Sequence, residues 1–411
     1  MSDLPGFAKA LETVLAFAAR VPPAAIERVP LEQARTRVLA EVLRADRDQP
    51  PFDRSTRDGF ALQASDATLR RVVGLVRAGE LWDSELTGAG LGEGDAVEIM
   101  TGAPVPAGAD AVVMMEHTTR TGDELVLAAG RQPVRGQNIV PRGAELAAGA
   151  EAMSAGIRLG AAEIAVAASV GAGDLSVYRR PRVAILATGD ELVELRETPA
   201  PQQIRNSNGY ALAALVEESG GEPLRLSIVR DTREALAAAL TRVLAEADLL
   251  LLSGGVSAGK FDLVEDALME LGAEFFFTGV RMQPGKPAVF GNLPRAGARA
   301  LPFFGLPGNP VSTQVTFACF AAPLVRALGG ETLCAPRFVK AALAHEVAAR
   351  PGLTRLLPAA VEGDMTKTAV QLVEWQGSGD QAANARGNGY ALLPDRAEPF
   401  RAGEVISVLL R

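Results

Sequence analysis

The stretch that decides the fold is 249–262, with the sequence LLLLSGGVSAGKFD. Four aliphatic residues in a row are typical of a strand buried on both faces. After them, Phe261, Val264 and Leu268 follow helical spacing. A glycine-rich turn joins the two patterns at the carboxyl end of the strand, where open parallel sheets bind their ligands. The stretch therefore predicts a strand, a ligand-binding turn and a helix of an α/β domain.

Strand and helix patterns alternate on both sides of this stretch, from residue 182 to about residue 328. Strands are predicted at 182–188, 224–229, 249–252, 275–280 and 302–305, and helices at 208–219, 235–247 and 311–328. Such alternation is typical of a parallel sheet that is covered by helices on both faces.

The flanking regions follow a different pattern. Short strand-like runs separated by glycine and proline turns fill roughly 55–140 and 335–411, as in small β-barrels or meanders. We therefore expect a multidomain protein of α/β plus β class. Its central three-layer α/β/α domain has a mostly parallel sheet, its N-terminal domains are β-rich, and its C-terminal domain is a β-barrel.

Composition excludes several classes of function. The net charge of −8 disfavours binding to nucleic acid or to an anionic membrane. Two cysteines and two widely separated histidines cannot form a disulfide framework or a zinc cage. Cys319 lies in an apolar run and is expected to be a buried small hydrophobe. The N-terminus lacks a signal-peptide pattern and no apolar run is long enough to cross a bilayer, so we expect a cytoplasmic protein.

The glycine-rich turn comes close to the P-loop pattern, with Gly254, Gly259 and Lys260 at the required spacing. The next residue is Phe261, so the hydroxyl that would hold magnesium is missing. Glycines here allow backbone N–H groups to approach an anion, and the following helix N-terminus adds positive potential. The pattern favours an anion-binding turn, and a tight turn without a ligand is the alternative.

Two further turns have the same character. Residues 305–312 (GLPGNPVS) lie between a buried strand and a long apolar helix, which Asn309 or Ser312 could cap whether or not a ligand binds. Residues 284–287 (PGKP) place Lys286 in a turn stiffened by two prolines, suitable for a phosphate or equally for an ordinary turn. Several turns at one sheet edge predict a ligand site better than any one alone.

Acidic residues follow the same strands. Asp190 and Glu191 come after the first strand, Asp231 follows the next, and Asp262 precedes the helix behind the glycine-rich turn. Taken singly, each could be a helix N-cap or a first-turn acid. Gathered at one edge, these carboxylates would repel one another unless a cation such as Mg²⁺ lay between them. This combination is typical of phosphoanhydride chemistry.

Together, in this order, STRDGFA, TGAPVP, ATGDEL, SGGVSAGKFD, QPGKP and GLPGNPVS resemble the molybdopterin molybdenumtransferases, which include the bacterial MoeA proteins and the C-terminal domain of gephyrin. The resemblance spans nearly the whole chain. The α/β segment alone also resembles the smaller molybdopterin adenylyltransferases and the CinA-type proteins. The motifs around Asp58 and Thr101 and the C-terminal β unit favour the molybdenum-inserting branch.

The resemblance implies an elongated homodimer whose active cleft lies between the α/β domain of one subunit and the β-rich domain of the other. It implies a discontinuous N-terminal domain of residues 1–24, 45–54 and 141–178, a β-rich domain of 55–140, a molybdopterin-binding α/β domain of 179–329 and a C-terminal β-barrel of 330–411.

The resemblance also implies the site residues. The catalytic residues would be Asp58, Thr101, Glu191 and Asp231. The residues that bind the pterin nucleotide would be Ser253, Gly254, Gly255, Ser257, Asp262, Lys286, Pro307, Gly308, Asn309 and Ser312. The metal ligands would be Asp190, Glu191 and Glu145. The chain departs from the common family pattern at Arg57, Ala144, Lys260 and Gln283.

The implied reaction inserts molybdenum from molybdate into adenylyl-molybdopterin with Mg²⁺ and releases AMP. The pterin supplies the sulfur ligands, which agrees with a chain that lacks a cysteine cluster. Transient contact with the molybdopterin adenylyltransferase is a further implied partnership. Two alternatives stay open at this point: adenylylation of molybdopterin by ATP, and a noncatalytic pterin-binding or scaffold protein.

Overall fold

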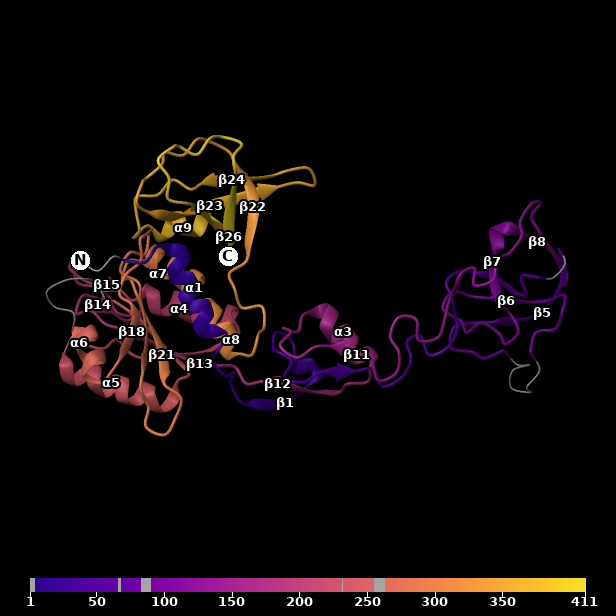
Figure 1. The fold of residues 1–411 in the computed structure, drawn as a ribbon, viewed down its shortest axis with the longest axis horizontal. Coiled ribbons are helices and arrows are strands. Elements are labelled where there is room, and N and C mark those ends of the chain that lie inside the picture. Colours follow the sequence, from indigo (N-terminus) through magenta and orange to yellow (C-terminus); the bar gives the residue numbers. More distant parts are fainter. Residues whose placement is uncertain (1–3, 66–67, 83–89, 231, 255–262) are drawn as a thin grey trace. The chain divides into compact units, whose positions relative to one another are not determined.

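The structure is a computed structural model that describes residues 4–65, 68–82, 90–230, 232–254 and 263–411 (Figure 1). The chain forms two compact units. The first comprises Met1–Glu41, Ala155–Gly160 and Asp174–Arg411, and the second comprises Val42–Ser154 and Ala161–Gly173.

A six-stranded sheet forms the centre of the first unit. In spatial order its strands are β16 (Glu222–Arg225), β13 (Arg182–Ala187), β17 (Leu249–Ser253), β21 (Leu301–Leu306), β20 (Val289–Leu293) and β18 (Glu274–Phe277). The first four run parallel, and the β21–β20 and β20–β18 pairs are antiparallel. The predicted mostly parallel sheet is confirmed.

Helices cover both faces of this sheet. One face carries α1 (Phe7–Ala18), α4 (Ser207–Glu218), α7 (Pro310–Thr316) and α8 (Ala322–Leu328), and the other carries α5 (Arg233–Glu246) and α6 (Leu263–Glu270) (Figure 1). Alternate residues of β17 serve the two layers, because Leu249 and Leu251 pack with the first set and Leu250 and Leu252 with the second. The three-layer α/β/α prediction is confirmed.

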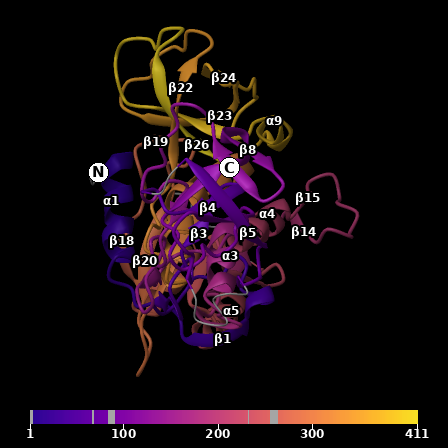
Figure 2. The same cartoon turned by 90° about the vertical axis from the view of Figure 1, so that its right-hand side faces the viewer.

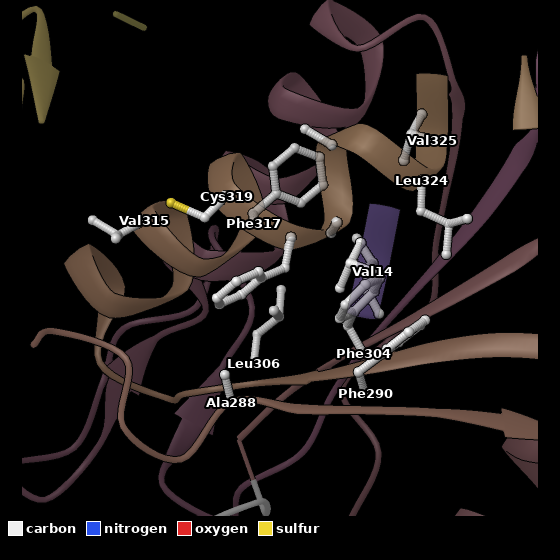
Figure 3. Close-up of a cluster of buried hydrophobic side chains, with 14 of the residues drawn as sticks. Val14, Ala288, Phe290, Phe304, Leu306, Val315, Phe317, Cys319, Leu324 and Val325 are labelled. Atoms are coloured by element: carbon white, nitrogen blue, oxygen red, sulfur yellow. The ribbon is translucent and has the colours of Figure 1, made fainter. Parts of the chain in front are cut away.

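The core beneath α7 and α8 is rich in phenylalanine (Figure 3). The rings of Phe290 and Phe304 stack with their centroids 4.5 Å apart. The predicted helix over 311–328 is interrupted by a π-helical segment, η3 (Phe317–Ala321), that contributes Phe317 to this core. Pro323 explains the interruption, since it has no N–H to donate to the carbonyl of residue 319 in a regular α-helix.

Several strands escaped prediction, and for two of them the sequence shows the reason. β20 contains Gly291, where a Cβ would lie 2.4 Å from both the Glu274 carbonyl oxygen and the Phe303 ring. A close approach of this kind requires glycine inside a strand. β23 (Thr354–Gly363) contains Pro358, a residue that argues against a central strand. Two predicted strands also end early, β16 at Arg225 and β18 at Phe277.

The C-terminal region of the first unit is a closed barrel. Its five strands are β22 (Phe338–Leu343), β23, β24 (Thr368–Leu372), β25 (Gly389–Leu393) and β26 (Val405–Leu410), and the β23–β25 pairing closes the ring. The short strand β19 (Met282–Gln283) pairs with β23, and α9 (Gln381–Arg386) lies between β24 and β25 in sequence. The predicted C-terminal β-barrel is confirmed.

The second unit is β-rich, as predicted. Its main sheet has the order β7 (Ala111–Met114), β4 (Gly59–Leu62), β6 (Asp95–Ile99), β5 (Leu69–Val76), β9 (Glu124–Leu127) and β8 (Thr118–Thr121). Smaller elements of this unit are β2 (Leu43–Arg44) paired with β11 (Glu151–Met153), β3 (Arg54–Ser55) paired with β10 (Ile139–Val140), η2 (Met115–His117) and α3 (Ala161–Ser169).

The remaining short elements belong to the first unit. They are β1 (Ile26–Pro30) paired with β12 (Asp174–Tyr178), η1 (Leu31–Gln33), and β14 (Leu192–Val193) paired with β15 (Ile204–Arg205). β15 leads directly into α4, which begins at Ser207 (Figure 2). The boundaries of the four predicted domains stay a prediction. Among the described residues, the helical stretch Pro310–Leu328 is long enough and apolar enough to span a bilayer. However, 83% of its most apolar 18 residues are buried inside this unit.

Candidate functional site

A cavity of about 930 Å³ opens at the carboxyl ends of β13, β17 and β21 in the first unit. Its wall comes from the turns after these strands, from the β14–β15 segment, from the start of α4 and from the segment before α9. The volume suits a small-molecule ligand, and the position is the one that open parallel sheets use. The turns predicted to form one ligand site therefore do meet in space.

Ser253, the last residue of β17, and Gly254, which follows it, both line this cavity. Gly254 has φ +92°, and a Cβ at this position would lie 2.5 Å from the backbone oxygen of Thr188. Only glycine fits such a backbone conformation and such a close approach without strain. The neighbouring turn after β21 contributes Pro307, Gly308 and Asn309 to the same wall. The two predicted binding turns are thus adjacent.

Asn208, which sequence reasoning assigned only to a helix, joins these two turns. Its side-chain Nδ2 donates to the Ser253 Oγ at 3.0 Å and to the Gly308 carbonyl oxygen at 2.7 Å. The preceding Asn206 caps α4, its Oδ1 accepting from the Gly209 N–H at 2.9 Å. The sequence signal that could have identified this region is the run 206–208 (NSN) directly before a helical pattern.

The C-terminal barrel also reaches the cavity. Gly379, just before α9, and Gln381, the first residue of α9, contribute to the wall. The Gln381 Nε2 donates to the Ser207 Oγ at 2.9 Å, and the Asn309 Nδ2 donates to the Ser378 Oγ at 2.9 Å. Asn309 occupies the N-cap position of α7 but makes no side-chain cap bond, and its side-chain amide bonds to the barrel segment instead. No feature of the sequence predicted this contribution from the barrel.

The acidic residues after β13 lie at the cavity edge. Glu191 lines the cavity, and both Asp190 and Glu191 are exposed. Within the described part of the chain, no group of three histidine, cysteine or acidic side chains is close enough to hold a metal ion. Two carboxylates can still suffice for Mg²⁺, which is usually bound by one or two carboxylates together with substrate phosphates and water.

The other predicted ligand-binding residues are placed less uniformly. Lys286 is exposed, next to Pro287 of the cavity wall. Ser312 is 4% exposed in the first turn of α7 and is not part of the wall. Four predicted site residues, Asp231, Gly255, Ser257 and Asp262, lie outside the described residues, as does Lys260 of the P-loop-like pattern.

In the second unit, Asp58 and Thr101 form a pair. The Thr101 N–H and Oγ1 both donate to the Asp58 Oδ1, at 2.6 and 2.9 Å. These bonds, the backbone one first, hold the pKa of Asp58 below its ordinary value despite a small opposing effect of desolvation. The side chain is therefore an exposed carboxylate that stays ionised at neutral pH. The turn at Gly102, with φ +87°, fixes Thr101 in this position.

Glu145, the third predicted metal ligand, also lies in the second unit. Its Oε1 accepts from the Arg54 Nη2 at 2.8 Å, with half of the Glu145 side chain exposed. An ion pair of this exposure contributes little to stability. The arginine partially neutralises the carboxylate that the resemblance assigns to a metal.

Comparison with known proteins gives matches along most of the chain. Residues 6–171 match the family model described as the MoeA N-terminal region (domain I and II). Residues 184–327 match the probable molybdopterin binding domain, and residues 340–410 match the MoeA C-terminal region (domain IV). The three matches follow the order of the motifs along the sequence.

Individual relatives agree. The chain is 39% identical over 307 residues to the molybdopterin molybdenumtransferase of Nostoc sp. PCC 7120, covering 74% of this chain and 70% of that one. It is 33% identical over 401 residues to the enzyme of the same name from Bacillus subtilis strain 168, covering 93% and 89%. The crystal structure of a molybdopterin biosynthesis MoeA protein from Pyrococcus horikoshii OT3 superposes with a TM-score of 0.81 at 26% identity, covering 100% of both chains.

Proposed function

Because the chain belongs to the molybdopterin molybdenumtransferase family, we propose that it inserts molybdenum from molybdate into adenylyl-molybdopterin and releases AMP. It is a transferase of molybdenum cofactor biosynthesis. The observation that carries the finer proposal is the cavity of about 930 Å³ at the carboxyl ends of three strands, where Ser253, Gly254 and Gly308 line a common wall.

The two turns at the strand ends bind the phosphoanhydride. Ser253 offers a hydroxyl, and the backbone at Gly254 has no side chain that would keep an anion away. Asn309 lies beside them and Lys286 is exposed next to the wall, where its ammonium group adds a positive charge. The wider part of the cavity, between Gln203 and Gln381, receives the rest of the pterin nucleotide.

Asp190 and Glu191 would hold Mg²⁺, with the substrate phosphates and water as further ligands. When bound, this ion would neutralise the charge that develops on the phosphate oxygens. Glu191 lines the same cavity as the two turns. We assign Asp231 and Asp262, on the family pattern, to the same reaction. We assign Glu145 to the metal on that pattern alone, since in the described chain its carboxylate pairs with Arg54.

Asp58 and Thr101 serve the molybdate side of the reaction. An ionised Asp58 repels a molybdate oxyanion, so its role is to hold Thr101 and to accept a cation or a proton rather than to bind the oxyanion directly. Both bonds from Thr101 end on the same oxygen, Oδ1, and neither occupies Oδ2. Arginine and lysine side chains supply the donors that molybdate needs.

The decisive experiment incubates the purified protein with adenylyl-molybdopterin, Mg²⁺ and molybdate and measures AMP. We expect AMP release that depends on molybdate, and its loss in Glu191→Gln. The matched control is Glu194→Gln, which removes a carboxylate that pairs with Arg225 outside the cavity wall. Absence of molybdate-dependent AMP contradicts the proposal, and turnover of ATP with bare molybdopterin would identify the preceding adenylylation instead.

On the family pattern we also propose that the protein is a cytoplasmic homodimer. The same pattern proposes that it makes transient contact with the molybdopterin adenylyltransferase. In the dimer proposed by that pattern, Asp58 and Glu191 act in one reaction from different subunits. Mixing Asp58→Asn with Glu191→Gln subunits then restores one intact site in each mixed dimer, about a quarter of the wild-type activity after random exchange. Activity confined to unmixed wild type would contradict the shared site.

A further inference from the structure

We infer that Asn208 is a positioning residue of the anion-binding wall of the cavity: it orients Ser253 as a hydrogen-bond donor toward the ligand and bonds to the Gly308 carbonyl oxygen. This inference rests on the proposed function, because it concerns how the phosphate groups of the pterin nucleotide are held. Asn208 is the second residue of α4, and its side chain contacts two elements that are far away in sequence, the end of β17 and the turn after β21.

The hydrogen-bond inventory of Asn208 is specific. A side-chain amide nitrogen carries two hydrogens. Here one hydrogen is donated to the Ser253 Oγ at 3.0 Å and the other to the Gly308 carbonyl oxygen at 2.7 Å. Aspartate has no hydrogen to donate at neutral pH and serine has only one, so neither residue could make both bonds. Asparagine is therefore the residue of this size that can join the two turns.

The bond to Ser253 determines what that serine can offer to a ligand. Ser253 is 3% exposed and lines the cavity. Its oxygen accepts from Asn208, so its single hydroxyl hydrogen is available for another acceptor. A phosphate oxygen in the cavity is such an acceptor. Asn208 thereby favours the orientation in which Ser253 acts as a donor toward an anion.

The bond to Gly308 acts in the same direction. A carbonyl oxygen at the wall of an anion site repels the anion, because both carry negative charge. The Gly308 oxygen accepts from Asn208, which partially neutralises it. The bond also fixes the turn after β21 against the turn after β17, where the ideal Cβ position of Gly308 is 3.8 Å from the Gly254 Cα. One side chain thus supplies a donor, masks an acceptor and fixes the spacing of the two turns.

The test measures the Kd of adenylyl-molybdopterin without molybdate for wild type, Asn208→Ala, Ser253→Ala and the double variant. We expect each single variant to weaken binding about tenfold. Because Asn208 acts in part through Ser253, we expect the double variant to bind clearly better than the product of the single effects predicts. The control Tyr210→Ala changes an exposed residue of the same helix outside the cavity wall and should bind like wild type.

The outcomes separate the inference from the function on which it rests. The positioning role would be overturned if the Kd changes of the two single variants multiplied fully in the double variant, or if Asn208→Ala bound the nucleotide as tightly as wild type. In either case, molybdate-dependent AMP release by the wild type would leave the proposed function intact. A wild type that neither binds the nucleotide nor releases AMP would overturn both. Alanine is the most favourable residue inside a helix, so α4 should persist in the variant. An unchanged melting temperature of the ligand-free Asn208→Ala protein, together with weaker binding, would separate positioning from a folding defect.

Discussion

Thr101 donates two hydrogen bonds to one oxygen of Asp58, from its backbone N–H at 2.6 Å and from its hydroxyl at 2.9 Å. The two residues lie 43 positions apart. Asp58 directly precedes β4 and Thr101 follows β6, at the same end of these two antiparallel strands. The bonds hold the pKa of Asp58 below its ordinary value. The pair therefore combines a fixed geometry with a carboxylate that is charged at neutral pH.

The first prediction concerns this pKa. Thr101→Val removes the hydroxyl bond and keeps the backbone one, so we expect the pKa of Asp58 to rise part of the way toward its ordinary value. The favourable effect of the pair exists above the pKa of an unfolded aspartate and is lost as pH falls through the lower folded value. Carboxyl NMR titration measures the shift. Thr56→Val, which loses a bond to the Asn138 oxygen instead, should leave the Asp58 titration unchanged.

The second prediction concerns the turn after β17. Gly254→Ala forces a Cβ into a left-handed conformation and against the Thr188 oxygen, so we expect a loss of about 1–3 kcal/mol in stability. Thermal unfolding and nucleotide binding should both be impaired. The matched change is Gly308→Ala, whose nearest neighbour to the new Cβ is 3.8 Å away. Equal melting temperatures for the two variants would contradict the strain argument.

The third prediction concerns an ion pair inside the first unit. The Glu331 Oε2 accepts from Arg158 at 2.7 and 3.0 Å, and the glutamate side chain is only 5% exposed. Glu331→Gln leaves a guanidinium poorly compensated, and we expect a loss of about 1–3 kcal/mol, measured by denaturant unfolding. Glu12→Gln breaks the exposed pair with Lys9 and should cost about 0.5 kcal/mol or less. If Glu331→Gln lowered the free energy of unfolding no more than Glu12→Gln does, the prediction would be wrong.

The fourth prediction concerns the aromatic core in Figure 3. Phe290 is fully buried and stacks on Phe304, so Phe290→Ala should destabilise the first unit by about 3–5 kcal/mol. Leu333→Ala removes a side chain that is 75% exposed and should stay within about 0.5 kcal/mol of wild type. Melting temperatures by calorimetry distinguish the two. A loss as small for Phe290→Ala as for Leu333→Ala would contradict the prediction, and would mean that the core relaxes into the space left by the phenyl ring.

Local patterns explain why much of the fold and part of the site could be predicted from sequence. The aliphatic run of β17 and the glycine that follows it are neighbours in the chain, and hydrophobic periodicity with glycine chemistry identifies both. The same reasoning missed β20, because Gly291 interrupts its pattern for the sake of a close packing contact with Phe303. That contact exists only in three dimensions.

The site residues that escaped prediction are those whose partners are distant in sequence. Asn208 bonds to a serine 45 positions away and Gln381 to a serine 174 positions away. Nothing in the local pattern around either residue indicates such a partner. Sequence reasoning finds where a strand ends and a turn can bind an anion, whereas side chains that cross between elements become apparent only once the sheet order is known.

The position of α1 has a consequence for the synthesis of the chain. Val14 of this helix packs in a buried cluster with Leu324 and Leu328 of α8. At a translation rate of about 5–20 residues per second, roughly 15 to 60 s separate the emergence of the two helices from the ribosome. Phe17 of α1 also packs against Phe276 and Phe290, which are made shortly before α8. For most of that interval the apolar side of the nascent α1 therefore has no native partner, and the whole second unit is made before α8 appears. Helix α1 is thus among the last elements to reach its final place, and chaperone binding to nascent chains should concentrate on residues 7–18.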